Sequence, residues 1–242
     1  MDAPSALALL GAAELELEGR LVDASNATFL CRLVDGAGRA DPADSPRCVY
    51  KPIRGERPLD DFPDGTLAYR ERAAYLLSEA TGWGIVPPTV LREGPFGQGM
   101  VQLWIEPDEQ ADVVAMVLAS DRRLRRVAVF DVLANNADRK GSHLLPLASG
   151  HVHGVDHGVC FAVAPKLRTV LWAWRGQPLE EDEESVIARV ARALGGPLRA
   201  ELEHVLSPAE VSATAGRAQR LLYTRLLPQP DPTRPAVPWP PF

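Results

Sequence analysis

Cysteine is scarce in this chain of 242 residues, which contains only Cys31, Cys48 and Cys160, none of them close to another. An odd, widely spaced set argues against a disulfide framework and indicates reduced thiols. Long apolar runs are also lacking, and Met1–Gly11 has neither the basic start nor the cleavage site of a secretory signal. We therefore expect a cytoplasmic protein with at most peripheral membrane contact.

An excess of positive charge is lacking as well. The chain has 26 basic and 32 acidic residues and a net charge of −6. Proteins that bind nucleic acid usually carry a basic surface, so we expect no nucleic-acid partner. The run Arg122–Arg126 contains four arginines, which one amphipathic helix would place on a solvated face. With 46% hydrophobic residues, the chain is long enough and apolar enough for a buried core.

The residue pattern changes from strands to helices near Glu106-Pro107. Before this point, alternation with period two predicts strands, and one stretch has helical spacing. The expected strands cover residues 14–22, 27–34, 47–51, 86–91 and 99–105, and the expected helix covers 67–80. After it, helices are expected over 112–119, 121–133, 166–174, 183–194, 198–206 and 208–226, with a short hairpin over 143–156.

This order predicts an α+β, bilobal protein-kinase-like fold with a small antiparallel-sheet lobe, one helix in that lobe, and a mainly helical large lobe. We expect a β-rich nucleotide-binding lobe over 1–106, a helical catalytic lobe over 107–227, and ATP between them. Residues 228–242 form a Pro-rich tail that cannot be helix or central strand. It lies extended on the body or is disordered, with Trp239 and Phe242 favouring docking, and it is a candidate site for a protein partner.

Two aspartates suggest phosphoryl transfer, because this reaction needs one carboxylate that orients the attacking hydroxyl and another that holds Mg²⁺ on the phosphates. Asp138 follows an apolar helix in a polar loop, and Asp156 follows a short strand and precedes a glycine-permitted turn. A hairpin turn centred near Ser149 would bring His143 close to Asp156. The alternative is that Asp138 only ties an irregular loop.

Lys51 ends an expected strand, where a rigid backbone can direct its charge to α and β phosphates. Glu71 on the following helix is positioned in sequence to pair with it. The turn 23–26 between the first two strands lacks the glycine that a phosphate-covering turn usually has. Ser25 and Asn26 could donate side-chain hydrogen bonds there, and an ordinary hairpin turn explains this segment equally well.

Five motifs in this order resemble the phosphatidylinositol 3-/4-kinase superfamily, with the type II phosphatidylinositol 4-kinases and an actinobacterial kinase-related family as the closest branches. The resemblance spans residues 14–175. The motifs are Val49-Tyr-Lys-Pro52, Arg70-Glu-x-Ala-Ala-Tyr75, Val86-Pro-Pro-Thr89, Asp131-x₄-Asn136-x-Asp138-Arg139 and Val155-Asp-His-Gly158.

The resemblance implies a role for each matching residue. Lys51 would contact ATP phosphates and Glu71 would position it. A segment of Gln102, Trp104 and Ile105 would surround the adenine. The catalytic pair would be Asp138 and Arg139, with Asp156 as the metal ligand.

His143 stands where these kinases carry an asparagine that binds a second metal. Because Mg²⁺ prefers oxygen ligands, His143 could hold Mn²⁺, bind phosphate or weaken catalysis. The eukaryotic type II enzymes also carry a cysteine-rich palmitoylated segment that this sequence lacks. We therefore expect a kinase with ATP, with Mg²⁺ or Mn²⁺, and with a hydroxyl acceptor that is a protein, the enzyme itself, a small alcohol or an inositol lipid.

Two other functions stay open from the sequence. A nucleotide-binding pseudokinase that acts as a scaffold would explain His143. A metal-binding or metallohydrolase domain would explain why four of the five histidines fall between His143 and His157. His151 and His153 lie two residues apart, so that in a strand they share a face and are geometrically able to bind one transition metal.

Overall fold

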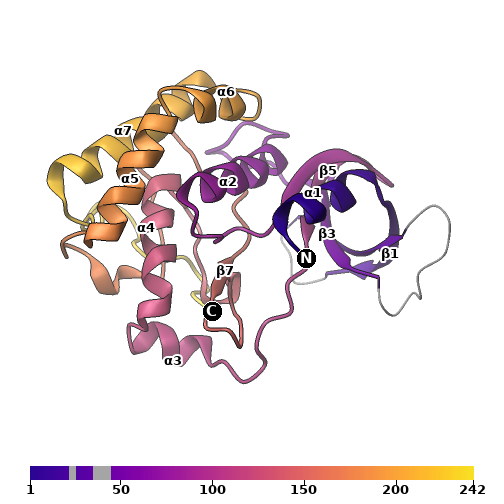
Figure 1. Cartoon of the computed structure of the whole chain (residues 1–242), viewed down its shortest axis with the longest axis horizontal. Helices are drawn as coiled ribbons and strands as arrows, with labels where there is room; N and C mark the ends of the chain where they lie inside the picture. The colour runs from indigo at the N-terminus through magenta and orange to yellow at the C-terminus, as the bar shows by residue number, and fades with distance from the viewer. Residues whose placement is uncertain (22–25, 35–44) are drawn as a thin grey trace. The chain divides into compact units, whose positions relative to one another are not determined.

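Five antiparallel strands form the main sheet, in the order β1-β2-β3-β5-β4 (Figure 1). The structure, a computed structural model, describes residues 1–21, 26–34 and 45–242. The strands of this sheet are β1 (Glu14–Arg20), β2 (Phe29–Val34), β3 (Arg47–Pro52), β4 (Thr89–Gly94) and β5 (Gly97–Leu103). Every neighbouring pair is antiparallel, as the sequence predicts.

Strand β3 shows how the period-two pattern orients the side chains of the sheet. Cys48 and Tyr50 are fully buried in the core, whereas Lys51 is only partly buried because successive residues point to opposite faces. Cys48 is the direct partner of Cys31 on β2, so the fold brings together two cysteines that are far apart in sequence. Both are free thiols.

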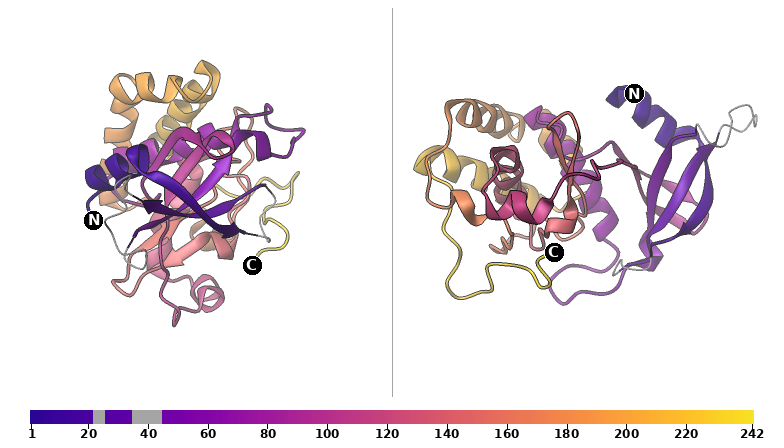
Figure 2. Two further views of the ribbon diagram at one scale, coloured as in Figure 1. Left: turned by 90° about the vertical axis from the view of Figure 1, so that its right-hand side faces the viewer. Right: turned by 90° about the horizontal axis from the view of Figure 1, so that it is seen from below.

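A helix that the sequence analysis missed, α1 (Ala3–Ala12), lies beside this sheet (Figures 1 and 2). Asp2 caps it by accepting a hydrogen bond from Ser5 N at 2.9 Å. Leu10 is fully buried in the sheet's core cluster. The helix escapes a periodicity test because it is apolar on nearly every side and shows no polar face.

Helix α2 (Leu67–Thr81) follows the short 3₁₀ turn η2 (Ile53–Gly55) and a loop. The Glu56 carboxylate accepts hydrogen bonds from the first amides of α2, Leu67 N at 3.1 Å and Ala68 N at 2.8 Å. A distant acid thus satisfies the donors that a helix leaves open at its start.

The chain divides into two compact units. Unit 1 contains residues 1–72 and 87–105, and unit 2 contains residues 73–86 and 106–242. Residues 73–86, which we had placed in the N-terminal lobe, group with unit 2 in this division. The nucleotide-binding and catalytic roles of the lobes stay a prediction.

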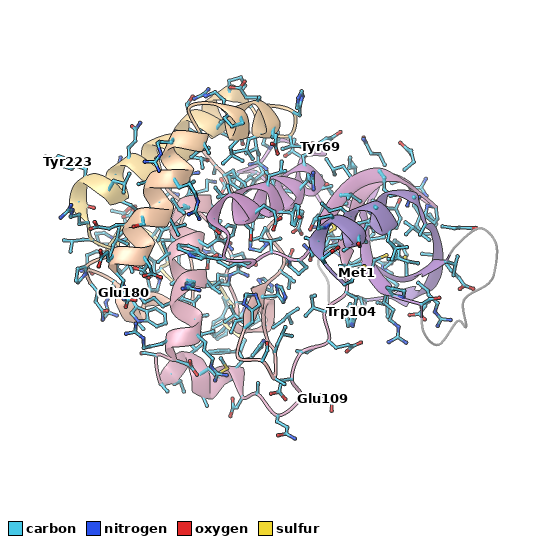
Figure 3. All side chains as sticks on the ribbon, viewed as in Figure 1. Met1, Tyr69, Trp104, Glu109, Glu180 and Tyr223 are labelled. Carbon is cyan, nitrogen blue, oxygen red and sulfur yellow. The ribbon has the colours of Figure 1, made fainter. Side chains whose placement is uncertain are left out.

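Helices dominate unit 2, and the predicted α+β class with a kinase-like arrangement of elements is confirmed. Its helices are α3 (Val113–Leu118), α4 (Arg125–Ala134), α5 (Glu181–Ala193), α6 (Pro197–Glu203) and α7 (Pro208–Thr224), with 3₁₀ turns η3 (Arg122–Leu124), η4 (Gly141–His143) and η5 (Trp172–Trp174). Helices α5 and α7 lie side by side (Figures 1 and 2). Phe130, Ile187 and Leu202 are fully buried, whereas Tyr223 projects from α7 into solvent (Figure 3).

The helix expected over residues 166–174 is wrong, apart from the single turn η5 at its end. Several backbone donors of this segment go to the loop after α4 instead of forming helical bonds with one another. Lys166 N donates to Asn135 Oδ1 at 2.8 Å, and Arg168 N donates to the Asn136 carbonyl at 2.9 Å. Because these partners are distant in sequence, local spacing could not predict them.

The Pro-rich tail lies extended on unit 2. The Trp172 indole donates to the Ala236 carbonyl at 2.8 Å, and Arg234 donates to the Pro165 carbonyl at 3.0 Å. Phe242 packs against Gly141, in keeping with its expected docking, but the Trp239 side chain is 87% exposed. Within the described part of the chain, no helix is long and apolar enough to span a bilayer.

Candidate functional site

Lys51 and Glu71 form an ion pair inside unit 1. Lys51 comes from β3 and Glu71 from α2, and Lys51 Nζ lies 2.7 Å from Glu71 Oε1. The Glu71 side chain is almost completely buried, while the Lys51 side chain retains some exposure. The carboxylate therefore holds the ammonium group at a defined position on the face of the sheet opposite Cys48 and Tyr50.

The turn between β1 and β2 is described only in part, and Ser25 lies outside the described residues. Asn26 Oδ1 accepts a hydrogen bond from Arg57 N at 2.9 Å, and the Asn26 carbonyl accepts one from Thr28 Oγ1 at 3.2 Å. Asn26 thus ties the end of the turn to the segment after η2.

The segment expected to surround adenine begins at the end of β5. Gln102 is buried, and its Nε2 donates to Thr89 Oγ1 at 2.8 Å across the β4–β5 pair. Trp104 N donates to the Arg47 carbonyl at 3.0 Å, and Ile105 is the last residue of unit 1. The side chain of Gln102 therefore contributes to the packing of the sheet.

The hairpin of β6 (Leu144–Pro146) and β7 (Val152–Gly154) has the expected register, with Leu145 opposite His153. This register brings His143 to Asp156, with Nε2 of the histidine 3.4 Å from Oδ2 of the aspartate. Asp156 has a left-handed backbone, with φ of 59°, and its side chain is half exposed. The Asp156 carboxylate therefore lies against His143 at the end of the hairpin and is partly exposed to solvent.

Asp138 lies in the loop after α4, close to two cations. Its carboxylate is 3.4 Å from Lys140 Nζ and 3.7 Å from Arg168 Nη2. Burial raises the pKa of Asp138 above its ordinary value, and Lys140 opposes this shift. Sequence reasoning did not name either cation. The position of Lys140 two residues after Asp138 could have suggested it, whereas Arg168 is brought near only by the extended 166–170 segment.

Arg139 is fully buried, and its contacts are with the protein interior. Its guanidinium donates to Asp131 Oδ1 at 2.9 Å, to the Val155 carbonyl at 2.9 Å, and to His157 Nε2 at 2.6 Å. Because an arginine only donates, His157 Nε2 must accept here. Asn136 adds a bond to Asp131 at 3.0 Å. Arg139 thus joins the loop of Asp138 to Val155, the residue directly before Asp156.

The residues at Asp156 fit Mg²⁺ or Mn²⁺ as partial ligands. Among residues 1–21, 26–34 and 45–242, there is no group of three or more His, Cys, Asp or Glu side chains that could hold a metal. Mg²⁺ is usually bound through one or two carboxylates together with waters and substrate phosphates. The accessible Asp156 carboxylate, with Asp138 in the same unit, suits that mode.

In the described part of the chain, the histidines join no group of three or more side chains that could hold a metal ion, so the alternative transition-metal site is not assembled. Nε2 of His151 lies 2.9 Å from the Gly84 carbonyl, and Nδ1 of His153 lies 3.2 Å from the Ile85 carbonyl. A carbonyl only accepts, so each of these ring nitrogens carries a proton. Their rings meet edge to face, and burial lowers the pKa of His153. These contacts anchor the hairpin to residues 84–85.

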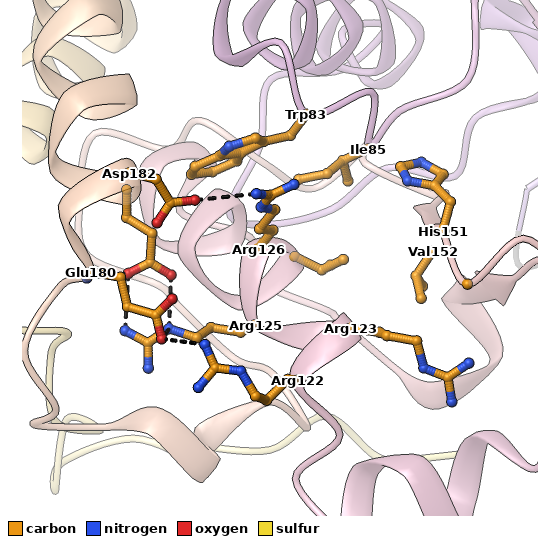
Figure 4. Close-up of a pocket in the computed structure, with 13 residues that line it drawn as sticks. Trp83, Ile85, Arg122, Arg123, Arg125, Arg126, His151, Val152, Glu180 and Asp182 are labelled. Carbon is orange, nitrogen blue, oxygen red and sulfur yellow. Dashed lines mark hydrogen bonds and ion pairs between the residues drawn. The ribbon is translucent and has the colours of Figure 1, made fainter.

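A pocket of about 360 Å³ in unit 2 is lined by none of the residues predicted for the kinase site, although His151 is part of its lining (Figure 4). Its arginines are matched by acids. Arg122 pairs with Glu180 at 2.7 Å and Arg126 with Asp182 at 3.1 Å, and the buried Arg125 pairs with Glu183. These three arginines of the basic run are therefore balanced by the start of α5, and Arg125 is buried instead of lying on the expected solvated face.

The chain is 45% identical to protein Rv2133c of Mycobacterium tuberculosis, over 97% of this chain and 95% of that protein. The chain belongs to the Rv2133c family. It is also 26% identical to phosphatidylinositol 4-kinase gamma 4 of rice (Oryza sativa subsp. japonica), over 48% of this chain and 24% of that protein. None of the protein-family models matches the chain.

Two solved kinases share the fold. The golgi casein kinase has a TM-score of 0.59 at 14% identity, with 91% of this chain and 74% of that chain covered. The proinflammatory kinase CtkA of Helicobacter pylori has a TM-score of 0.53 at 11% identity, with 90% and 94% covered. The Rv2133c-family chain thus has a kinase-like fold.

Proposed function

We propose that this protein is an ATP-dependent phosphotransferase that moves the γ-phosphoryl group to a hydroxyl acceptor. The observation that carries the proposal is the convergence of His143 and Asp156 in the same unit as Asp138, in a chain with a kinase-like fold. The resemblance to the phosphatidylinositol 3-/4-kinases and the match to the rice enzyme agree with it.

The proposed roles are distributed over the two units. Lys51 contacts the ATP phosphates as a point charge, and Glu71 restrains it at 2.7 Å. Gln102, Trp104 and Ile105 contribute the segment at the adenine. Asn26, with Ser25 before it, contributes donors at the phosphate turn.

In unit 2, Asp138 accepts a hydrogen bond from the acceptor hydroxyl and orients it. A raised pKa makes this carboxylate a better base, while Lys140 and Arg168 oppose the rise and hold the carboxylate in place. Arg139 positions the loop from its buried site. Asp156, with His143, would hold Mg²⁺ or Mn²⁺, which would neutralise charge on the phosphates.

The acceptor is proposed by class only. A hydroxyl of a protein, of the enzyme itself, of a small alcohol or of an inositol lipid would meet Asp138 in the same way. The inositol lipid is the class to which the rice relative's name points, and at most peripheral contact with a membrane would then be needed.

The test compares wild type, Asp138→Asn and Asp156→Ala with ATP and either Mg²⁺ or Mn²⁺. We expect ATP with metal to raise the Tm of wild type and Asp138→Asn, and to raise that of Asp156→Ala much less. Phosphoryl transfer or ATP hydrolysis should fall by at least about 100-fold in Asp138→Asn. Asp182→Asn, which removes an exposed carboxylate of unit 2, is the matched control and should behave as wild type.

One alternative is favoured by a specific residue. His143 lies 3.4 Å from the carboxylate proposed to bind metal, and imidazole is a poor ligand for Mg²⁺. A nucleotide-binding pseudokinase would bind ATP with metal but transfer no phosphoryl group to any acceptor class. Absence of a Tm shift with wild type and every metal would exclude both functions.

A further inference from the structure

Pro241 and Phe242 contact the loop between Asp138 and His143. Gly141 N donates to the Pro241 carbonyl at 2.8 Å, and the Phe242 ring lies over Gly141. Gly141 is three residues after Asp138 and two before His143. We propose that residues 236–242 hold this loop in its conformation, and that Phe242 is a positioning residue. Its effect on catalysis rests on the proposed function.

A second contact connects the same residues to the other side of the loop. The Ala236 carbonyl accepts hydrogen bonds from Thr169 N at 3.1 Å and from Trp172 Nε1 at 2.8 Å. Segment 168–170 in turn pairs with Arg139, which donates from its N to the Arg168 carbonyl at 3.0 Å and accepts from Val170 N at 3.1 Å. The tail is therefore connected to the loop directly, at Gly141, and indirectly, through segment 168–170.

These contacts hold the residue that follows each of the two cations near Asp138. Arg168, which carries the guanidinium 3.7 Å from the Asp138 carboxylate, precedes the residue that Ala236 holds. Lys140, 3.4 Å from the same carboxylate, precedes the residue that Pro241 and Phe242 hold. Loss of the tail contacts would thus free two cations next to the proposed base, as well as the loop itself.

A substitution at Gly141 can test this contact directly. A Cβ built on Gly141 would overlap the Phe242 ring and lie 2.7 Å from its Cε1, and the three nearest atoms all belong to that ring. The backbone of Gly141 is not left-handed, so its φ does not itself prevent alanine. Alanine at this position should therefore act by displacing Phe242, so that removal of the ring as well should add little to its effect.

Trp239 supplies the control for an aromatic side chain in the same segment. Its side chain is 87% exposed, against 44% for Phe242. A general effect of losing a large apolar side chain from the tail would appear with both residues. An effect through the loop would appear only with Phe242.

The experiment measures amide hydrogen exchange at residues 141 and 169 in the full chain, without nucleotide. The variants are Gly141→Ala, Phe242→Ala, the double variant and Trp239→Ala. We expect Gly141→Ala and Phe242→Ala each to speed exchange at both amides by about tenfold or more, and Trp239→Ala to change nothing. The double variant should exchange no faster than the faster single variant, because both substitutions remove the same contact. Wild-type exchange in Gly141→Ala or in Phe242→Ala, or additive effects in the double variant, would overturn the proposed contact.

The same variants are then assayed for ATP binding and turnover. We expect kcat to fall by about tenfold in Gly141→Ala, in Phe242→Ala and in the double variant, and to stay unchanged in Trp239→Ala. KM for ATP should not change, because misplacement of a catalytic loop lowers the rate more than the binding. Loss of amide protection with an unchanged kcat would overturn the positioning role. If wild type neither binds nor turns over ATP, the proposed function fails, while the exchange cycle still decides whether residues 236–242 hold the loop.

Discussion

Loss of the Asp131 carboxylate should strongly destabilise the fold, even when the replacing side chain has the same size. Its side chain and that of Arg139 both have 0% exposure, and the guanidinium binds the carboxylate at 2.9 Å. The Asp131→Asn variant keeps the size of the side chain but removes the charge. The guanidinium of Arg139 would then stay buried without a counter-ion.

The expected loss follows from that burial. Breaking a buried ion pair by removing one partner destabilises a protein by about 3–5 kcal/mol, because the remaining charge is not solvated. The amide oxygen of asparagine can still accept one of the bonds, which favours the lower end of this range. For a chain of this size, about 3 kcal/mol corresponds to a fall in Tm of roughly 6–12 °C.

Calorimetry of wild type and Asp131→Asn at pH 7 measures this loss. The matched control is Asp182→Asn, because Asp182 also pairs with an arginine, at 3.1 Å, but both side chains are more than half exposed. An exposed pair contributes at most about 1 kcal/mol, so the control should lose little. A loss below about 1 kcal/mol for Asp131→Asn, or equal losses for both variants, would refute the reasoning from burial.

Three further predictions concern the proposed site. Glu71→Gln breaks the 2.7 Å ion pair with Lys51 and should weaken ATP binding by about tenfold, which is equivalent to about 1.4 kcal/mol. Isothermal titration calorimetry measures this affinity, and an unchanged affinity would argue against the role of the pair. His143→Asn replaces an imidazole by an oxygen ligand, which Mg²⁺ prefers, so the variant should raise kcat with Mg²⁺ relative to kcat with Mn²⁺. An unchanged ratio of the two kcat values would show that His143 does not contact the metal. Burial raises the pKa of Asp138, so its carboxyl stabilises the fold below its unfolded pKa of 3.8 and loses this contribution as pH rises through the folded value. Asp138→Asn should therefore keep or raise the Tm at pH 7 while abolishing transfer, and a clear fall in Tm would contradict this sign.

The β6–β7 hairpin shows which contacts a local sequence pattern can predict. A turn near Ser149 was enough to predict Leu145 opposite His153, and this register carries His143 to Asp156. Strand alternation likewise predicted β3 and the side chain of Lys51 at its end. In both cases the residues that interact are linked by a short, regular element, so the geometry of the backbone transmits their spacing.

The segment 166–174 shows where that reasoning fails. Its spacing suggests a helix, but its amides donate to Asn135 and Asn136, which are about thirty residues away. The same loop buries Arg139, which sequence alone could only place beside Asp138 as a catalytic residue. Only the fold decides which polar groups are removed from water and must find partners.

By itself, the sequence determined the elements with a clear period, the order of the five motifs, and the hairpin that joins His143 to Asp156. The tertiary structure alone decided that Cys31 faces Cys48, that Arg168 approaches Asp138, and that Phe242 covers Gly141. The physical reason is the distance along the sequence between the residues that interact. Periodicity records which face of an element is buried, whereas contacts between distant segments depend on how the buried surfaces pack.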